Sequence, residues 1–104
     1  MFFSKKMSMP AAETFWNKFS AEEDNIIEGL SQNPMSIVEF VDSMLKPVFP
    51  YFKKELEFEL GFNDGVGEFF FYHLDNKNLA RDGQTLKDMM PDDLKKRWQF
   101  IIES

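Results

Sequence analysis

A strict alternation of charged and apolar side chains over residues 55–62, which read ELEFELGF, constrains the fold more than any other feature of the chain. Successive side chains of a β-strand point to opposite faces, so a period of two residues is typical of a strand with one buried face. The pattern therefore predicts a strand whose leucines and phenylalanines face a core. Its other face carries a row of three glutamates, Glu55, Glu57 and Glu59.

A second strand is predicted directly after the first. Residues 63–67 read NDGVG, a composition that is typical of the tight turn in a β-hairpin. Residues 68–74 read EFFFYHL, and this strand is aromatic on both faces because three phenylalanines are consecutive. Either the odd-numbered set, which includes His73, or the even-numbered set, which includes Tyr72, must lie on the outer face of the sheet. The sequence leaves this choice open.

A long helix is expected before the hairpin, over residues 11–31. Apolar residues recur at helical spacing from Phe15 to Leu30 and fall on one face of such a helix. Ser20 and Glu23 form a capping box, which offers a break at Ser20 as the alternative. The apolar stripe stays in phase across Ser20, so one continuous helix is preferred.

A second helix is expected to begin at Ser36, whose capping box with Glu39 precedes another apolar stripe. It should end at residue 45 or 46, because the residue before a proline, here Pro47, disfavours helical backbone.

After the hairpin, apolar residues at helical spacing predict a helix over about residues 79–90. Gly83 within it marks either a helix that packs close to the sheet or a break. A short helical turn is expected at residues 91–93. Alternating residues 98–103 then predict the last strand.

These elements predict an α+β fold with two N-terminal helices followed by β-β-α-β. We expect a small three-stranded sheet of antiparallel type, with helices on one face. The simplest arrangement places the strand at residues 55–62 in the centre, antiparallel to both neighbours. A chain of 104 residues fits one domain. We assign residues 10–104 to this domain and residues 1–9 to a flexible arm.

Composition excludes several functional classes. The chain has no cysteine, which excludes disulfides and thiolate zinc sites, and it has one histidine, which excludes a His-rich metal site. Its net charge of −6 argues against nucleic acid as a partner. No apolar run has the length of about 20 residues that a bilayer span requires, and no signal peptide is recognisable. We therefore expect a cytoplasmic protein with no cofactor, no metal and no membrane partner.

Four segments of the chain resemble the motifs of a family of small uncharacterised bacterial α+β proteins. That family has an FWxWF helix, an LxFExG strand, a REFxIxxDG strand and a WxVxxF strand. The corresponding segments here are FWNKF at residues 15–19, LEFELG at 56–61, EFFFYHLD at 68–75 and WQFI at 98–101. Lys18 stands where the family has an aromatic residue, and Asn76 replaces the glycine of Asp-Gly. These motifs are structural, so the resemblance implies the fold and no activity.

The candidate interaction surface combines Glu55, Glu57 and Glu59 with an outer aromatic residue such as Tyr72, and with its neighbour His73. Aromatic side chains rimmed by carboxylates on an open sheet are typical of a protein-binding surface. An alternative is that the N-terminal arm, a loop or a second copy of the chain covers this face.

The sequence thus predicts a non-enzymatic, acidic protein-interaction domain, of the kind found in bacterial immunity proteins that neutralise a basic partner. The partner is another protein or a second copy of the chain. A homo-oligomeric structural domain is one alternative, and a small ligand binder or enzyme that uses His73 is another. No serine lies in a nucleophile elbow beside His73, so we expect no catalytic residue.

Overall fold

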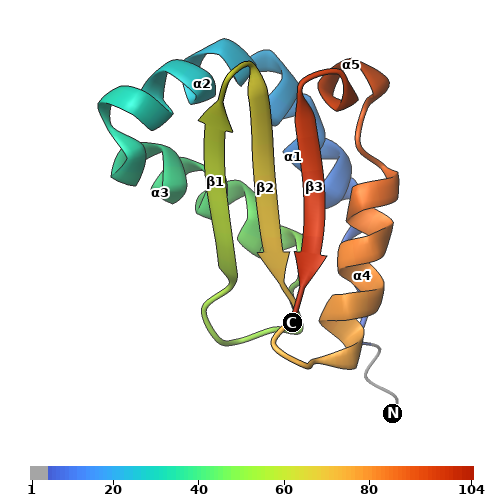
Figure 1. The fold of residues 1–104 in the computed structure, drawn as a ribbon. Coiled ribbons are helices and arrows are strands. Elements are labelled where there is room, and N and C mark those ends of the chain that lie inside the picture. Colours follow the sequence, from blue (N-terminus) through green and yellow to red (C-terminus); the bar gives the residue numbers. More distant parts are fainter. Residues whose placement is uncertain (1–4) are drawn as a thin grey trace.

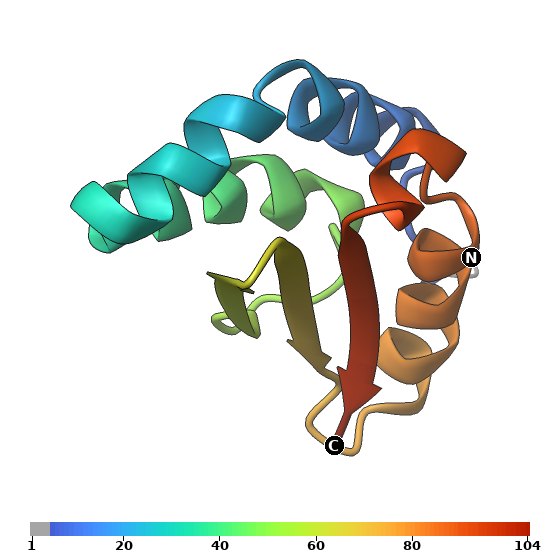
Figure 2. The same ribbon diagram turned by 45° about the horizontal axis from the view of Figure 1, so that its top comes forward.

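The computed structural model describes residues 5–104, which form an α+β fold with all five α-helices packed on one side of a three-stranded sheet (Figures 1 and 2). This confirms the predicted fold class. The elements in chain order are α1 (Met9–Ala21), α2 (Glu23–Gln32), α3 (Pro34–Leu45), the 3₁₀-helix η1 (Lys46–Val48), β1 (Glu57–Asn63), β2 (Val66–Tyr72), α4 (Lys77–Asp88), α5 (Asp92–Lys95) and β3 (Trp98–Glu103).

The sheet has the order β1-β2-β3, with β1 antiparallel and β3 parallel to β2. The predictions that the strand at residues 55–62 lies in the centre and that the sheet is of antiparallel type were therefore wrong, because β2 is central and pairs with β3 in parallel, so the sheet is mixed. The central strand is β2, which carries aromatic side chains on both faces. β1 is an edge strand, and the glutamates on its solvent face suit an edge because their like charge discourages pairing with a second copy of the same strand.

A two-residue loop joins β1 to β2. Asp64 and Gly65 both have positive φ, at 53° and 79°, which matches the turn that suits the twist of a hairpin. Asn63 pairs with Val66 across this loop. β1 begins at Glu57, so Glu55 precedes the strand instead of forming its first outward position.

The expectation of one continuous helix over residues 11–31 was also wrong. Glu22, with φ −102° and ψ 11°, separates α1 from α2. The physical reason is a contact between Glu23 and residues much later in the sequence. The carboxylate of Glu23 accepts a hydrogen bond of 2.9 Å from Nε1 of Trp98 and pairs with Arg97 at 3.0 Å, which anchors the start of α2 to β3.

The next helix, α3, begins at Pro34, two residues before the predicted start at Ser36. Its N-cap is Asn33, whose side chain accepts a hydrogen bond from the backbone N–H of Ser36. The Asn-Pro sequence therefore starts α3, since proline is well suited to the first position of a helix.

The core fills the space between the helices and the inner face of the sheet. Phe69, Phe71 and Phe100 are at most 3% exposed and lie on this inner face. α4 is continuous through Gly83, where a Cβ atom would lie 2.8 Å from the ring of Phe71. Gly83 thus marks close packing of helix on sheet, the first of the two predicted alternatives.

The predicted arm at residues 1–9 falls partly on residues 1–4, which lie outside the described residues. Of the remainder, Ser8 donates a backbone hydrogen bond of 2.8 Å to the carbonyl of Val48. Nη2 of Arg81 donates one of 2.6 Å to the carbonyl of Lys5. Met9 already belongs to α1. Across the described part of the chain, no helix combines the length and apolar character needed to span a membrane.

Candidate functional site

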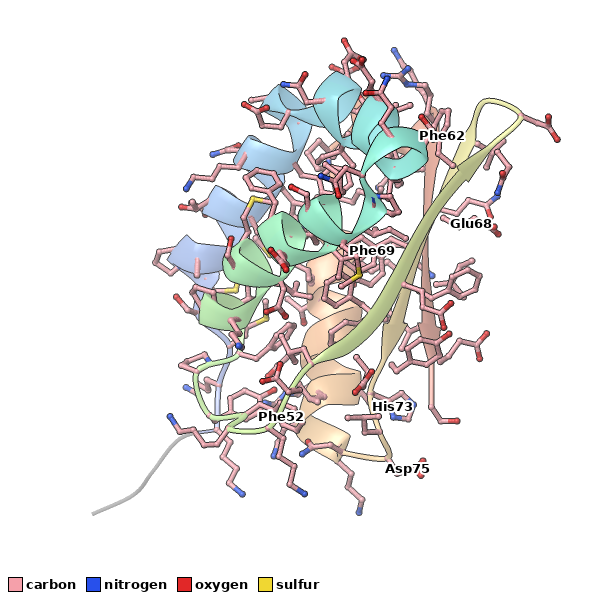
Figure 3. The ribbon with its side chains drawn as sticks, turned by 90° about the vertical axis from the view of Figure 1, so that its left-hand side faces the viewer. Phe52, Phe62, Glu68, Phe69, His73 and Asp75 are labelled. Carbon is pink, nitrogen blue, oxygen red and sulfur yellow. The ribbon has the colours of Figure 1, made fainter. Side chains whose placement is uncertain are left out.

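The face of the sheet that points away from the helices is called the outer face. In Figure 1 this face lies toward the viewer, and in Figure 3 the side chain of Glu68 points away from the helices while that of Phe69 points toward them. The strand register places the outer-face residues in three rows across the sheet: Glu57, Tyr72 and Glu103; Glu59, Phe70 and Ile101; and Gly61, Glu68 and Gln99.

The centre of the outer face is apolar. Phe70 and Ile101 are register partners on β2 and β3, and Tyr72 follows two residues after Phe70 on the same face. All three are only partly buried, whereas Phe69 and Phe71 on the inner face are at most 1% exposed. The even-numbered set of the aromatic run is therefore the outer one, which settles the choice that the sequence left open.

Carboxylates surround this apolar centre. The outer face holds four glutamates (Glu57, Glu59, Glu68 and Glu103) and no lysine, arginine or histidine at any of its register positions. Like charges on neighbouring strands repel, so the arrangement costs some stability of the isolated domain. It also gives this face a negative potential that attracts a basic partner.

A hydrogen bond joins two side chains across this face: the phenol of Tyr72 donates to Oε1 of Glu59 at 2.7 Å. This hydrogen bond raises the pKa of Tyr72 above its ordinary value, and slight desolvation and the charges of Glu59 and Glu103 act in the same direction. The phenol is thus held protonated, and its ring lies beside the apolar centre with its polar end toward the carboxylates.

The structure brings three of the five predicted residues together: Glu57, Glu59 and Tyr72 share the outer face. Glu55 lies before β1, where its carboxylate is 3.8 Å from Nζ of Lys46. His73 follows the end of β2, and its Nδ1 accepts a hydrogen bond of 3.1 Å from the backbone of Asp75. Glu55 and His73 therefore stand apart from the shared surface.

Sequence reasoning missed two members of the outer face, Glu68 and Glu103. Both lie at the ends of predicted strands. Glu68 is two residues before Phe70 on β2, and Glu103 is two residues after Ile101 on β3. Period-two counting outward from Tyr72 would have assigned Glu68 to the same face. The same counting groups Glu103 with Gln99 and Ile101 on the last strand, and the register of β3 against β2 pairs it with Tyr72 on the outer face.

A second polar cluster lies away from the outer face, where Asp82 of α4 is only 5% exposed. Tyr51 donates to its Oδ2 at 2.6 Å, and Arg81 donates to both oxygens at 2.9 and 3.0 Å. Burial opposes ionisation of Asp82, but the hydrogen bonds from Arg81 and Tyr51 outweigh it, so the pKa of Asp82 lies below its ordinary value. Burial, followed by the bond to Asp82, raises the pKa of Tyr51.

This cluster has the character of a structural network. Its carboxylate is already neutralised by Arg81, and its phenol is held protonated, so neither is poised to exchange protons near neutral pH. Within residues 5–104, no group of three or more histidine, aspartate or glutamate side chains is arranged to hold a metal ion.

The fold and the outer face together define a two-layer α+β domain with an open, acidic sheet surface. A scan of protein-family models and searches of curated proteins and of solved structures find no match to this chain.

Proposed function

We propose that the chain is a non-enzymatic protein-interaction domain whose outer face binds a basic partner protein. The observation that carries this proposal is the partly exposed apolar centre of Phe70, Tyr72 and Ile101 within a rim of four glutamates. Bacterial immunity proteins, which neutralise a basic toxin by binding it, are the functional class that this chemistry fits best. A cytoplasmic location accords with a chain that lacks cysteine.

The two parts of the surface have different tasks in such a complex. Burial of the aromatic centre supplies affinity, because fully desolvated tyrosine and other aromatic side chains are enriched at the energetic centres of interfaces. The glutamates at the rim speed association with a positively charged surface and select against acidic partners. Their effect should weaken as salt shortens the range of electrostatic attraction to about 8 Å at physiological ionic strength.

A basic partner explains the surface better than a second copy placed face to face. Such a dimer would bring the four outer glutamates of each copy toward one another without a cation on either side. Like charges brought together at an interface cost several kcal/mol. This cost is on the order of the free energy that burial of the small apolar centre could contribute to the dimer. The homo-oligomeric alternative is therefore less well supported.

The proposal is tested by affinity capture from a lysate of the source cell, with identification of the captured protein by mass spectrometry. The key variant is Glu57→Gln/Glu68→Gln, which removes two charges from the outer face. The matched control is Glu13→Gln/Glu39→Gln, which removes the same charge from exposed positions on α1 and α3. The captured protein is then purified and its affinity for each variant is measured by calorimetry at two salt concentrations.

We expect a basic protein to be captured. The outer-face variant should weaken its binding by about tenfold or more, while the control variant binds as the wild type does. A captured protein that is acidic, or that binds both variants equally well, would contradict the proposal. Capture of nothing at either salt concentration would also contradict it.

A further inference from the structure

The free edge of β1 carries backbone groups that no described element pairs. β1 is hydrogen-bonded to β2 alone, and no backbone hydrogen bond joins residues 57–63 to another part of residues 5–104. An edge of this kind is a template for an added strand. In Figure 3 this edge of the sheet faces the viewer, with α2 and α3 beside it.

The register determines which residues of β1 present these groups. Gly67 donates to the carbonyl of Arg97, just before β3, and His73 donates to that of Glu103 at the end of β3. The odd-numbered residues of β2 therefore direct their backbone groups to β3. The even-numbered residues of β2 therefore bond to their β1 partners at the odd-numbered positions 57, 59, 61 and 63. The backbone N–H and C=O groups of the alternate residues Phe58, Leu60 and Phe62 must then point away from β2, toward the free edge of the sheet.

A groove lies on the helix side of the same edge, beside residues 60–63 at its hairpin end. Its volume is about 290 Å³, and its apolar lining includes Ile27 and Leu30 of α2 together with Leu60 and Phe62 of β1. Leu60 and Phe62 are only partly buried, so their side chains retain apolar surface at the edge. On the opposite side of the same edge, Glu57 and Glu59 of the outer face project to solvent.

We propose that the basic partner inserts an extended segment along β1 as a fourth strand, an inference that rests on the proposed function. Alternate side chains of an added strand point to the two faces of the sheet. Those on the outer face would meet Glu57 and Glu59, and those on the helix side would enter the groove. The segment recognised is thus one in which basic and apolar residues alternate.

The edge distinguishes this occupant from a second copy of the chain. In an antiparallel pair of β1 strands, each copy would bring Glu57 and Glu59 to the joint outer face, whose register positions hold no lysine, arginine or histidine. An added strand with lysine or arginine opposite Glu57 and Glu59 would instead form cross-strand pairs of opposite charge, which stabilise the pairing of the two strands.

The test is an NMR titration with a peptide of seven residues, the length of β1, in which lysine and valine alternate. A second peptide has the same sequence with N-methyl groups on alternate backbone amides, which blocks hydrogen bonding to an edge. The protein variant is Ser31→Trp, which fills the groove from an exposed position on α2. Ser43→Trp on α3 is the matched control: each serine is exposed and donates to the carbonyl three residues earlier.

We expect the alternating peptide to shift the amide resonances of Phe58, Leu60 and Phe62. N-methylation and Ser31→Trp should each weaken binding by about tenfold or more, whereas Ser43→Trp leaves it unchanged. No shift at these amides would overturn the inference. The same shifts on raising protein concentration without peptide would also overturn it, in favour of a second copy.

The outcome separates this inference from the proposed function. If the N-methylated peptide binds equally well and shifts only outer-face residues, edge addition is wrong while the acidic interaction surface stands. If the outer-face glutamine variant also leaves the captured partner's affinity unchanged, both proposals fail.

Discussion

The phenol of Tyr51, in the segment between η1 and β1, donates a hydrogen bond of 2.6 Å to the carboxylate of Asp82 in the middle of α4. Arg81 bonds the same carboxylate and also the carbonyl of Lys5. Three segments that are distant in the sequence are thus joined at one buried charge. The part of the chain that enters β1 is positioned through this contact.

Asp82→Asn should lower the free energy of unfolding by about 2 kcal/mol, because the amide replaces one acceptor oxygen of a buried carboxylate and leaves the donors of Tyr51 and Arg81 without a full set of acceptors. Tyr51→Phe should cost about 1 kcal/mol, since Asp82 keeps its bonds to Arg81. Urea unfolding measures both. Asp88→Asn is the control, because that aspartate is exposed on the same helix. Equal stability of the two asparagine variants would show that the network is dispensable.

The same pair predicts how stability depends on pH. The pKa of Asp82 is lowered on folding from 3.8, so its contribution is present above that pH and is lost as pH falls through the folded value. The pKa of Tyr51 is raised from 10.0, so its contribution is present below pH 10.0 and is lost as pH rises toward the folded value. Urea unfolding across pH should show an acid slope that shrinks in Asp82→Asn and an alkaline slope that shrinks in Tyr51→Phe. Unchanged slopes would contradict the assignment.

Gly83→Ala should destabilise the protein by about 1–3 kcal/mol, even though alanine is favoured over glycine in a helix by about 1 kcal/mol. The added Cβ would lie 2.8–2.9 Å from ring carbons of Phe71, which is fully buried and cannot move freely. Thermal unfolding measures the loss. Phe71→Leu is the control background: there the cost of Gly83→Ala should shrink, and an unchanged cost would place its origin elsewhere.

The sequence was sufficient for features that depend on neighbouring residues. The alternation around Phe58 predicted β1, and Asp64-Gly65 predicted the hairpin turn. The sequence was not sufficient for features that depend on contacts between residues distant along the chain. The break at Glu22 depends on the bond between Glu23 and Trp98, which are 75 residues apart.

The strand order and the set of residues on the outer face also depend partly on neighbouring residues and partly on distant ones. Period two separates Phe69 from Phe70 but does not say which one faces the helices. The central position of β2 was still accessible to reasoning from residues, because a strand that is aromatic on both faces suits the centre of a sheet better than one with a row of glutamates. Alternation groups Glu103 with Ile101, but its position beside Tyr72 follows from the register of β3 against β2.

Glu23→Ala should lower the free energy of unfolding by about 1–3 kcal/mol, because it removes the acceptor of a buried indole N–H. Trp98 is 2% exposed, and its Nε1 donates to Glu23 at 2.9 Å. The indole N–H resonance of Trp98 should shift in the NMR spectrum while that of Trp16, which donates to Leu86, stays in place. Glu22→Ala is the control, with an expected change within about 0.5 kcal/mol. Equal losses for the two variants would contradict the anchoring role of Glu23.

The three consecutive phenylalanines of β2 give the most direct test of which sheet face is open. Phe69→Ala and Phe71→Ala should each lower the free energy of unfolding by about 3–5 kcal/mol, because both side chains are buried among other rings. Phe70→Ala should cost about 1 kcal/mol, since it loses only the outer-face contact with its cross-strand neighbours. Denaturant unfolding measures all three.

Affinity for the partner should depend most on Phe70, the phenylalanine whose removal costs the least stability. Phe70→Ala keeps the fold, so any loss of affinity for a captured basic protein reports on the outer face itself, and we expect a loss of about tenfold or more because a central aromatic anchor is removed. Gln99→Ala, at the rim of the same face, should bind within about threefold of the wild type. If Phe70→Ala were as destabilising as Phe69→Ala, its ring would be covered in solution, and the open face on which the proposed function depends would not exist.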